Sequence, residues 1–174
     1  MLLRPAFAPL LLGVLMTLSS NPALTQTPAD CSMPEQRQFD FWIGHWDVFM
    51  PDGKRAGENL IEAVANGCAL LESWTGAGGL TGMSLNNWDR QDRRWRQHWV
   101  DSSGGLLRLE GAWSDGHMVL LGQSPHATRP GLVVHQRITW TPMPDGSVRQ
   151  LWESSEDMQT RWTTLFDGKY IKRR

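Results

Sequence analysis

Tyrosine, cysteine and net charge are all scarce in this chain. Its 174 residues include one Tyr and two Cys, and the formal charge at neutral pH is −1. Such a balance gives no electrostatic reason to bind nucleic acid, so we expect no nucleic-acid partner. CxxC and HExxH spacings are absent, and we therefore expect no metal site built on a local motif. No apolar run after residue 18 is long enough to cross a bilayer.

The first 23 residues are typical of a secretory signal peptide. Arg4 supplies a positive charge, and residues 6–18 form an uncharged apolar core that is too short to span a membrane. Ala23 and Ala29 are the candidate cleavage sites, although neither has a clean small-x-small pattern. An alternative, a lipoprotein acylated at Cys31, is disfavoured because the preceding residues do not form a lipobox. We expect a periplasmic or secreted protein, with no membrane insertion once the signal is removed.

The two cysteines form the only pair available for a disulfide. An exported protein enters an oxidising compartment, where Cys31 and Cys68 can be joined. The closed loop would contribute about 4 kcal/mol to stability in the chain-entropy model. The alternative is one buried Cys68 and one free Cys31 in a flexible tail. We favour the disulfide, which would tie the mature N-terminus to the domain.

Short apolar or alternating runs, separated by turn signals, fill the chain from residue 41 onward. Asp-Gly and Asn-Gly pairs between the runs suit hairpins, because they adopt positive φ at little cost. Long amphipathic helical stripes are absent. The pattern predicts an all-β, up-and-down antiparallel barrel of about ten strands. The expected strands cover residues 41–50, 58–64, 68–74, 81–88, 94–101, 106–113, 118–123, 132–141, 147–154 and 161–166, the last ending at a turn over 167–169.

A short N-terminal helix is the one helical element that we expect. Ser32 and Glu35 have the spacing of a capping box, with Pro34 in the first turn. The helix or 3₁₀ turn would precede Phe39 and end near Phe41. The chain then divides into a signal peptide (1–23), an N-terminal tail with the short helix (24–38) and a barrel domain (39–174).

Tryptophan is abundant, with ten in the chain, and four of them follow a polar residue by two positions. Residues two apart share one face of a strand. If that face is the barrel interior, the lumen is both polar and aromatic. Equally, the tryptophans could fill a small barrel while the polar groups accept their N–H. The pairs are Glu72-x-Trp74, Asn86-x-Trp88, Gln97-x-Trp99 and Gln150-x-Trp152.

Five blocks resemble a family of secreted bacterial proteins of unknown function that is placed with the calycin or lipocalin-like barrels. They are "FDFWIGHWDV", "CALLESW", "TGMSLNNWD", "WRQHWVDSSGG" and "FDGKY", and they cover most of the chain from Phe39 to Tyr170. Gly44-x-Trp46 also resembles the Gly-x-Trp signature of lipocalins. The resemblance implies that Trp46 packs across the barrel bottom under a late arginine, Arg161 or Arg173. About ten strands depart from the lipocalin eight and are closer to fatty-acid-binding or nitrobindin-like barrels.

Carboxylates are the best candidates for chemistry inside such a barrel. Glu72 shares a strand face with Trp74, and Asp101 shares one with Trp99, so either could serve as a general acid or base. The alternative is a structural role, in which each carboxylate accepts an indole N–H and stabilises the barrel. Haem ligation by a single histidine, as in nitrobindin-like barrels, is weakened because His45 and His98 would point outward if the tryptophans point inward, and His135 is the remaining candidate on a strand. We expect no cofactor.

Three functions fit these observations. The first is a binding barrel for a small, partly apolar ligand, with Trp74, Trp99, Trp140 and Trp152 as stacking surfaces and Glu72, Gln97, Asp101 and Gln150 as polar contacts. The second is an enzyme that uses Glu72 or Asp101 in the same lumen. The third is a structural or interaction module with a filled core. The sequence leaves the oligomeric state open.

Overall fold

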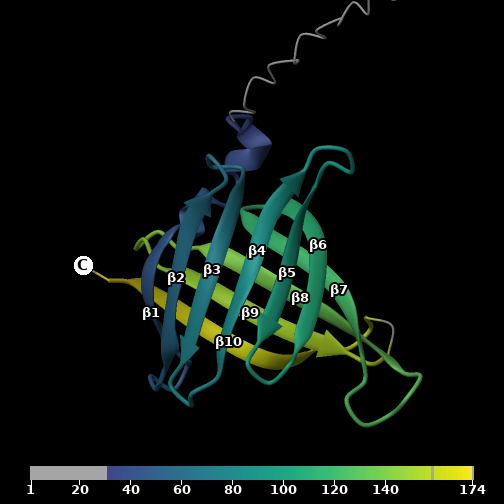
Figure 1. The fold of residues 1–174 in the computed structure, drawn as a ribbon. Helices are drawn as coiled ribbons and strands as arrows, with labels where there is room; N and C mark the ends of the chain where they lie inside the picture. The colour runs from purple at the N-terminus through teal and green to yellow at the C-terminus, as the bar shows by residue number, and fades with distance from the viewer. Residues whose placement is uncertain (1–30, 158, 174) are drawn as a thin grey trace, which may run out of the picture.

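Ten β-strands with short connections make up most of the described chain (Figure 1). The computed structural model describes residues 31–157 and 159–173, so the predicted signal peptide lies outside the described residues. Two 3₁₀ turns, η1 (Pro34–Arg37) and η2 (Asp40–Trp42), precede the strands. The strands are β1 (Gly44–Phe49), β2 (Arg55–Val64), β3 (Ala69–Gly76), β4 (Thr81–Asp89), β5 (Arg94–Asp101), β6 (Leu106–Ser114), β7 (His117–Pro125), β8 (Val133–Pro142), β9 (Val148–Ser155) and β10 (Thr163–Lys172).

The ten strands close into one antiparallel barrel. Each strand pairs with the strands before and after it in the chain, and β1 closes the barrel by pairing with β10. In that closing pair, Trp46 lies opposite Lys172 and Val48 lies opposite Tyr170. The prediction of an all-β antiparallel barrel of about ten strands is confirmed.

The β6–β7 hairpin shows how the turn signals work. Ser114 pairs with His117, which leaves a two-residue loop of Asp115 and Gly116. Both loop residues have positive φ, 51° and 83°. A type I′ turn needs this geometry, and an Asp-Gly pair adopts it readily. The predicted turn at this position is therefore present.

The last strand is longer than the sequence predicts. Asp167, Gly168 and Lys169, which the sequence suggests are a turn, lie inside β10 and pair with residues 149–151 of β9. A Cβ at Gly168 would come within 2.5 Å of Phe166 Cε1 and 3.0 Å of Val48 Cγ1. The glycine is thus required by the close approach of an inward ring, and the prediction of a turn here was wrong.

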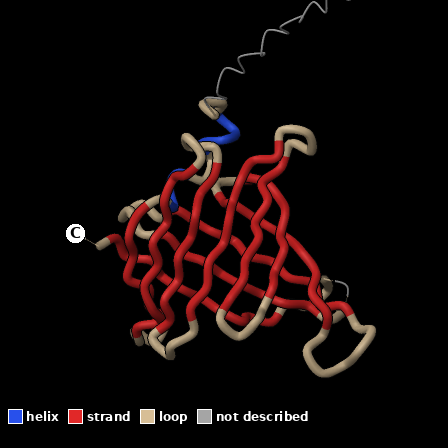
Figure 2. Tube along the Cα trace, in the orientation of Figure 1, coloured by secondary structure: helices blue, strands red, loops and turns tan. Residues whose placement is uncertain are grey.

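One end of the barrel is closed by residues 34–42, which we call the plug (Figures 1 and 2). The predicted short helix or 3₁₀ turn is present as two 3₁₀ turns, and the second ends at Trp42, past the predicted domain boundary at residue 38. The N-cap of η1 is Met33 rather than Ser32. The backbone N–H of Met33 donates a hydrogen bond to Gln36 Oε1 at 3.3 Å. The plug therefore belongs to the barrel end rather than to an N-terminal tail.

The disulfide between Cys31 and Cys68 anchors the plug. The two Cα atoms lie 5.1 Å apart, and the bond links the start of the described chain to the β2–β3 turn. Arg37 strengthens the same junction, because it donates hydrogen bonds to the carbonyl oxygens of Cys31 and Gly67 and pairs with Asp40. The predicted disulfide is confirmed.

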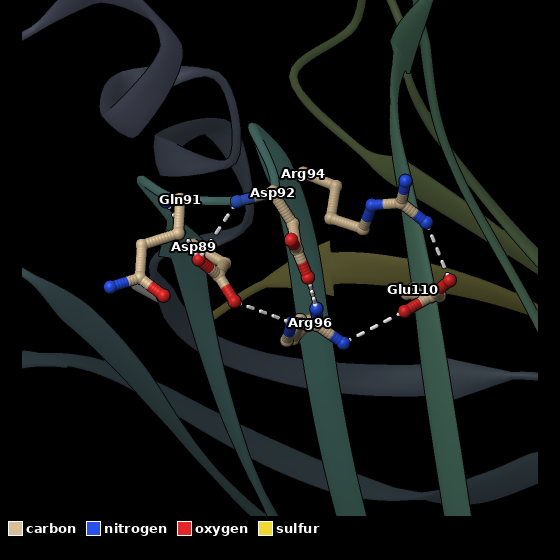
Figure 3. Close-up of polar contacts among 6 residues, drawn as sticks. All are labelled: Asp89, Gln91, Asp92, Arg94, Arg96 and Glu110. Carbon is tan, nitrogen blue, oxygen red and sulfur yellow. Dashed lines mark hydrogen bonds and ion pairs between the residues drawn. The ribbon is translucent and has the colours of Figure 1, made fainter.

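An ion-pair cluster on the outer wall joins β4, β5 and β6 near the plugged end (Figure 3). Arg96 sits at its centre and pairs with Asp89 at 2.8 Å, with Glu110 at 2.8 Å and with Asp92. Arg94 also reaches Glu110, at 2.6 Å. These charges lie on the solvent side of the wall, opposite the inward side chains of the same strands.

Candidate functional site

The barrel interior is layered along its axis. β1 starts shortly after the plug and leads away from it, so antiparallel pairing makes every odd-numbered strand run from the plug to the open end. Inward side chains two residues apart therefore step outward along the axis. On three odd strands these steps read apolar, polar, tryptophan: Leu70, Glu72 and Trp74 on β3; Trp95, Gln97 and Trp99 on β5; Val148, Gln150 and Trp152 on β9.

The lowest layer is a packed aromatic floor against the plug. Phe39 stacks on Trp42 with ring centroids 5.0 Å apart, and it meets Trp95 and Trp140 edge-on at 5.5 and 5.1 Å. Trp46 donates its indole N–H to the carbonyl oxygen of Trp42 at 2.9 Å. All five rings are at most 2% exposed. The floor is a packed aromatic core.

The middle layer is a buried hydrogen-bond network centred on Glu72. Its Oε1 accepts from Asn59 Nδ2 at 2.7 Å, and its Oε2 accepts from Ser84 Oγ at 2.5 Å. Asn86 Nδ2 donates to Ser84 Oγ at 2.8 Å, and Gln97 Nε2 donates to Asn86 Oδ1 at 2.9 Å. The network thus crosses four adjacent strands, β2 to β5, and no cation takes part in it.

The network continues on the other side of Asn59 to β10 and β9. Asn59 Nδ2 also reaches the Tyr170 hydroxyl at 3.3 Å, and that hydroxyl donates to Gln150 Oε1. Tyr170 is the only tyrosine of the chain and is buried. Tyr170 therefore connects Gln150 to Glu72 through the side-chain amide of Asn59.

The neighbours of Glu72 are all oriented as donors toward it. A serine hydroxyl has one donor and two acceptor sites. Ser84 Oγ already accepts from Asn86 and, at 3.4 Å, from Gln97, so its own proton points to Glu72. Asn59 gives Glu72 its amide N–H, while its own Oδ1 has no hydrogen-bond partner among the described residues. The donors of Asn59 and Ser84 are therefore already used by Glu72, and the groups left to accept further hydrogen bonds are Asn59 Oδ1 and the Glu72 oxygens.

Burial shifts the titration of both acids in this layer. Loss of hydration raises the pKa of the Glu72 carboxyl, and the hydrogen bonds from Ser84 and Asn59 offset only part of that shift. Burial likewise raises the pKa of Tyr170 well above its usual value, with a further contribution from the nearby Glu72 charge. The interior therefore favours the protonated form of Glu72 more strongly than water does.

The upper layer encloses a cavity of about 250 Å³. Its wall includes six of the side chains that the sequence singles out: Glu72, Trp74, Gln97, Trp99, Gln150 and Trp152. Leu107, Ile138, Phe166 and Tyr170 complete the inner wall, while Leu80 and Leu165, 43% and 49% exposed, form the rim. The cavity thus reaches solvent at the end opposite the plug.

Two of the three wall tryptophans have their N–H groups bound by protein acceptors. Trp99 donates to Asp101 Oδ2 at 3.2 Å, and Trp152 donates to Gln136 Oε1 at 2.7 Å. These rings therefore contribute apolar and π surface to the cavity rather than hydrogen-bond donors. Trp74 meets Phe166 edge-on, with ring centroids 6.2 Å apart.

Two of the eight predicted contact residues lie away from the cavity wall. Trp140 is buried in the floor, where it packs on Phe39 and Trp42. Asp101 caps the β5–β6 turn: its Oδ1 accepts from the Ser103 and Gly105 backbone N–H groups at 2.9 and 3.0 Å. Hydrogen bonds, led by that of the Ser103 hydroxyl, hold the pKa of Asp101 below its usual value. Ligand contact by the other six residues stays a prediction.

The fourth polar-x-Trp pair faces inward but points the other way along the axis. β4 is an even-numbered strand and runs toward the plug, so Trp88 follows Asn86 into the lower part of the barrel. There Trp88 meets Trp95 edge-on at 6.4 Å. The direction of the strand, and not the spacing of the pair, separates this tryptophan from the three at the cavity.

The ring of Trp46 lies beside a lysine rather than beside either expected arginine. Trp46 lies across the plugged end, and Lys172 Nζ lies 5.5 Å from its ring centroid. Arg173 instead reaches Asp47 and Glu58 on the outer wall, and Arg161 binds Asp157, so neither expected arginine stacks on Trp46. Gly44 has φ 151°, and a Cβ there would come within 2.9 Å of Lys172 Cε.

The sequence missed several residues that build the site. Asn59, Ser84 and Tyr170 complete the network, and Ile138 and Phe166 complete the cavity wall. A signal existed for two of them: Asn59 precedes the apolar Ile61 by two positions and so shares its inward face, and Ser84 precedes Asn86 by two positions. Tyr170 had no local signal, because its role comes from closure of β10 onto β1.

Clusters of metal-ligating side chains are not found in residues 31–157 and 159–173. No group of three or more His, Cys, Asp or Glu in those ranges could hold a metal ion. His45 and His98 are exposed on the outer wall, as the alternation with Trp46 and Trp99 predicts. No helix of the described chain is long and apolar enough to span a bilayer.

Comparison with known proteins adds no relative. No protein-family model matches the chain, and no curated protein matches it.

Proposed function

We propose that this protein is an exported, calycin-like barrel of up-and-down topology that binds one small, partly apolar molecule in the cavity at its open end. The observation that carries the proposal is the cavity itself, with a polar base and walls of tryptophan. Ligand sites are commonly apolar hollows with a few convergent polar groups, and the mouth of a β-barrel is a frequent place for them. The closed antiparallel barrel supports the calycin-like assignment.

The size of the cavity bounds the ligand. An apolar cavity of about 150 Å³ holds benzene, and pockets for drug-sized molecules start at about 300 Å³. At about 250 Å³, this cavity fits a molecule between those two sizes. A compact one- or two-ring body, or a short branched chain, matches it, whereas a long acyl chain would have to extend past the rim formed by Leu80 and Leu165.

Export is supported by the disulfide. Cys31 and Cys68 are bonded, and such bonds persist chiefly in oxidising compartments. Together with the signal-like N-terminal sequence, this favours a periplasmic or secreted protein. The ligand would then be a molecule met outside the cytoplasm.

A second candidate function is acid–base catalysis by Glu72. The favouring observation is a buried carboxyl of raised pKa at a cavity wall, which is a frequent property of catalytic acids. Tyr170 is the other titratable residue of the wall, and its hydroxyl is held by Gln150. Asp101 is not a candidate for this role, because it caps a turn outside the cavity wall.

Native mass spectrometry of protein purified from the periplasm tests the binding proposal. We expect a mass above that of the mature chain, and extraction of the bound molecule should shift the tryptophan emission, because three indoles line the cavity. Add-back of the extract should restore the spectrum. Chemical change of the extract by the protein, lost in Glu72→Gln, would identify the enzyme instead.

Two matched variants locate the effect. Trp99→Phe changes a tryptophan of the cavity wall, and Trp88→Phe changes one with the same motif that faces the lower barrel. Trp99→Phe should lose part of the emission change, and Trp88→Phe should keep it. A bare mass with no emission change against lipid and aromatic panels would favour the filled structural core.

A further inference from the structure

Glu72 is a buried acid without a counter-ion. Its ion-pairing atoms lie within 4.0 Å of no Lys, Arg or His among the described residues, while the ion pairs of this protein lie on the outer wall and in the loops. The cavity wall likewise contains no basic side chain. A buried charge is normally paired, since desolvation of a lone ion is costly. Glu72 therefore has no cationic partner among the described residues: it either holds a proton or, when ionised, is available to a cation that enters the cavity.

The hydrogen bonds around Glu72 leave its carboxylate able to accept a further donor. Asn59 on β2 and Ser84 on β4 each donate one bond to it, and each carboxylate oxygen keeps a second acceptor site. Tyr170 on β10 is the one titratable group facing it from the surrounding strands, and it donates away from Glu72, to Gln150. None of these three neighbours carries a positive charge that could pair with the Glu72 carboxylate.

The cavity above Glu72 also suits a cation. Trp74, Trp99, Trp152 and Phe166 supply four π systems to its wall. Aromatic faces attract ammonium groups, most strongly where water is excluded, and tryptophan is the best of the three ring types. The same features disfavour an anionic ligand, because a carboxylate and aromatic faces repel it and the cavity wall has no basic side chain to pair with it.

We propose that the ligand is a small organic cation, a protonated amine on a compact apolar body, whose ammonium group binds at Glu72 while its body lies among the tryptophans. This inference rests on the proposed binding function and names its ligand class. It excludes molecules with a carboxylate head, fatty acids included. Neutral donors such as alcohols would bind more weakly, because they offer a hydrogen bond without the charge–charge attraction of an ammonium group to a carboxylate.

Amine and proton compete for the same oxygens in this arrangement. In the empty cavity, burial favours the protonated form of Glu72, and an arriving ammonium group favours the carboxylate. Binding should therefore release a proton, and amine affinity should rise with pH until Glu72 is ionised in the free protein. Each pH unit within that window should bring an increase of up to tenfold in affinity.

Three probes of similar shape test the charge: 2-phenylethylamine, 2-phenylethanol and phenylacetate, each titrated against the mature protein by tryptophan fluorescence and calorimetry. We expect the amine to bind at least tenfold more tightly than the alcohol, and phenylacetate to bind least. Glu72→Gln should reduce amine affinity at least tenfold and leave the alcohol unchanged. Glu110→Gln removes the same charge from the outer wall and should change neither.

The outcomes separate the two proposals. Equal or tighter binding of the alcohol or phenylacetate would overturn the cation assignment and leave the binding barrel standing. Binding of none of the probes at millimolar concentration would contradict both. If Glu72→Gln does not fold, the pH profile of the wild-type protein still decides, since an amine affinity that is flat from pH 4 to 8 would also overturn the assignment.

Discussion

The two ends of this barrel use the same residue type for opposite purposes. At the plugged end, Trp42, Trp46, Trp95 and Trp140 are at most 2% exposed and pack ring on ring. At the open end, Trp74, Trp99 and Trp152 are only partly buried and surround a cavity. The difference comes from the plug, which supplies Phe39 and Trp42 to fill one end and has no counterpart at the other end among the residues that the structure describes.

The contrast extends to how each end is held. The disulfide and Arg37 tie the plug to the β2–β3 turn, and the Arg96 cluster braces the neighbouring wall (Figure 3). At the open end, the long loop between β7 and β8 is joined to the β9–β10 loop through His126 and Arg129, which contact Glu156. We therefore expect stability to depend on the plugged end and binding to depend on the open end.

The largest expected effect is on the floor. Trp42→Ala should cost about 3–5 kcal/mol of unfolding free energy, because it removes a fully buried ring from a packed cluster. Trp74→Ala should cost about 1 kcal/mol, since that ring is partly exposed and already borders a cavity. Urea denaturation of both variants measures the difference. Equal losses would mean that the two ends do not differ in packing.

Loss of the disulfide should rank next. Replacing both Cys31 and Cys68 by serine should lower the free energy of unfolding by about 2–4 kcal/mol, because the unfolded chain regains the freedom of the closed loop. Affinity for the ligand should stay within about twofold, as the cavity lies at the other end. Denaturation and fluorescence titration of the same sample check both statements, and a large fall in affinity with intact folding would contradict the separation.

The pH dependence of stability reports on the middle layer. The pKa of Glu72 is raised on folding, so between its unfolded and folded values the native state holds a proton that the unfolded state has lost. The contribution of Glu72 to stability is therefore greatest at acid pH, falls as pH rises above about 4.5, and levels off beyond the folded pKa. Each unit of the shift corresponds to about 1.4 kcal/mol.

Glu72→Gln should remove this decline. Its unfolding free energy, followed by urea denaturation from pH 4.5 to 8, should fall less with pH than that of the wild-type protein. Glu110→Gln, on the outer wall, should follow the wild-type curve. Parallel curves for wild type and Glu72→Gln would show that the buried carboxyl does not titrate as described.

The smallest effect should come from the outer charge cluster. Arg96→Gln breaks three ion pairs near the plugged end, but the side chains concerned are 27–54% exposed. Such pairs are screened by water and salt. We expect a slight fall in melting temperature at low salt that disappears at 1 M NaCl. A large fall at both salt concentrations would mean that the cluster, rather than the floor, holds this end together.

Much of the fold was predictable because local patterns and tertiary structure agree. Strand β5 spans the residues that the alternation predicts, and the Asp115-Gly116 hairpin follows from its turn residues. The Asp-Gly pair at 167–168 led to a wrong prediction, because a glycine can meet either of two needs. It adopts positive φ in a turn, and it leaves space beside an aromatic ring where a Cβ would clash. Sequence spacing cannot distinguish these needs without the neighbouring strand.

The candidate site was only partly predictable. Parity along each strand gave the inward face correctly for Glu72, Gln97 and Gln150, but not the height of each residue along the barrel axis. Trp140 shares the inward face and yet lies in the floor, because β8 runs toward the plug. The cavity itself depends on how side-chain volumes from all ten strands fill the lumen, and no single stretch of sequence encodes that sum.

The most direct test of the account is an NMR titration of the ten indole N–H signals with 2-phenylethylamine. The account predicts that Trp74, Trp99 and Trp152 shift in a saturable way, while Trp42, Trp46, Trp95 and Trp140 in the floor stay in place. Trp162, outside the cavity wall, serves as an internal control. Shifts confined to the floor, or saturable shifts only at indoles outside the cavity, would contradict a binding site at the open end.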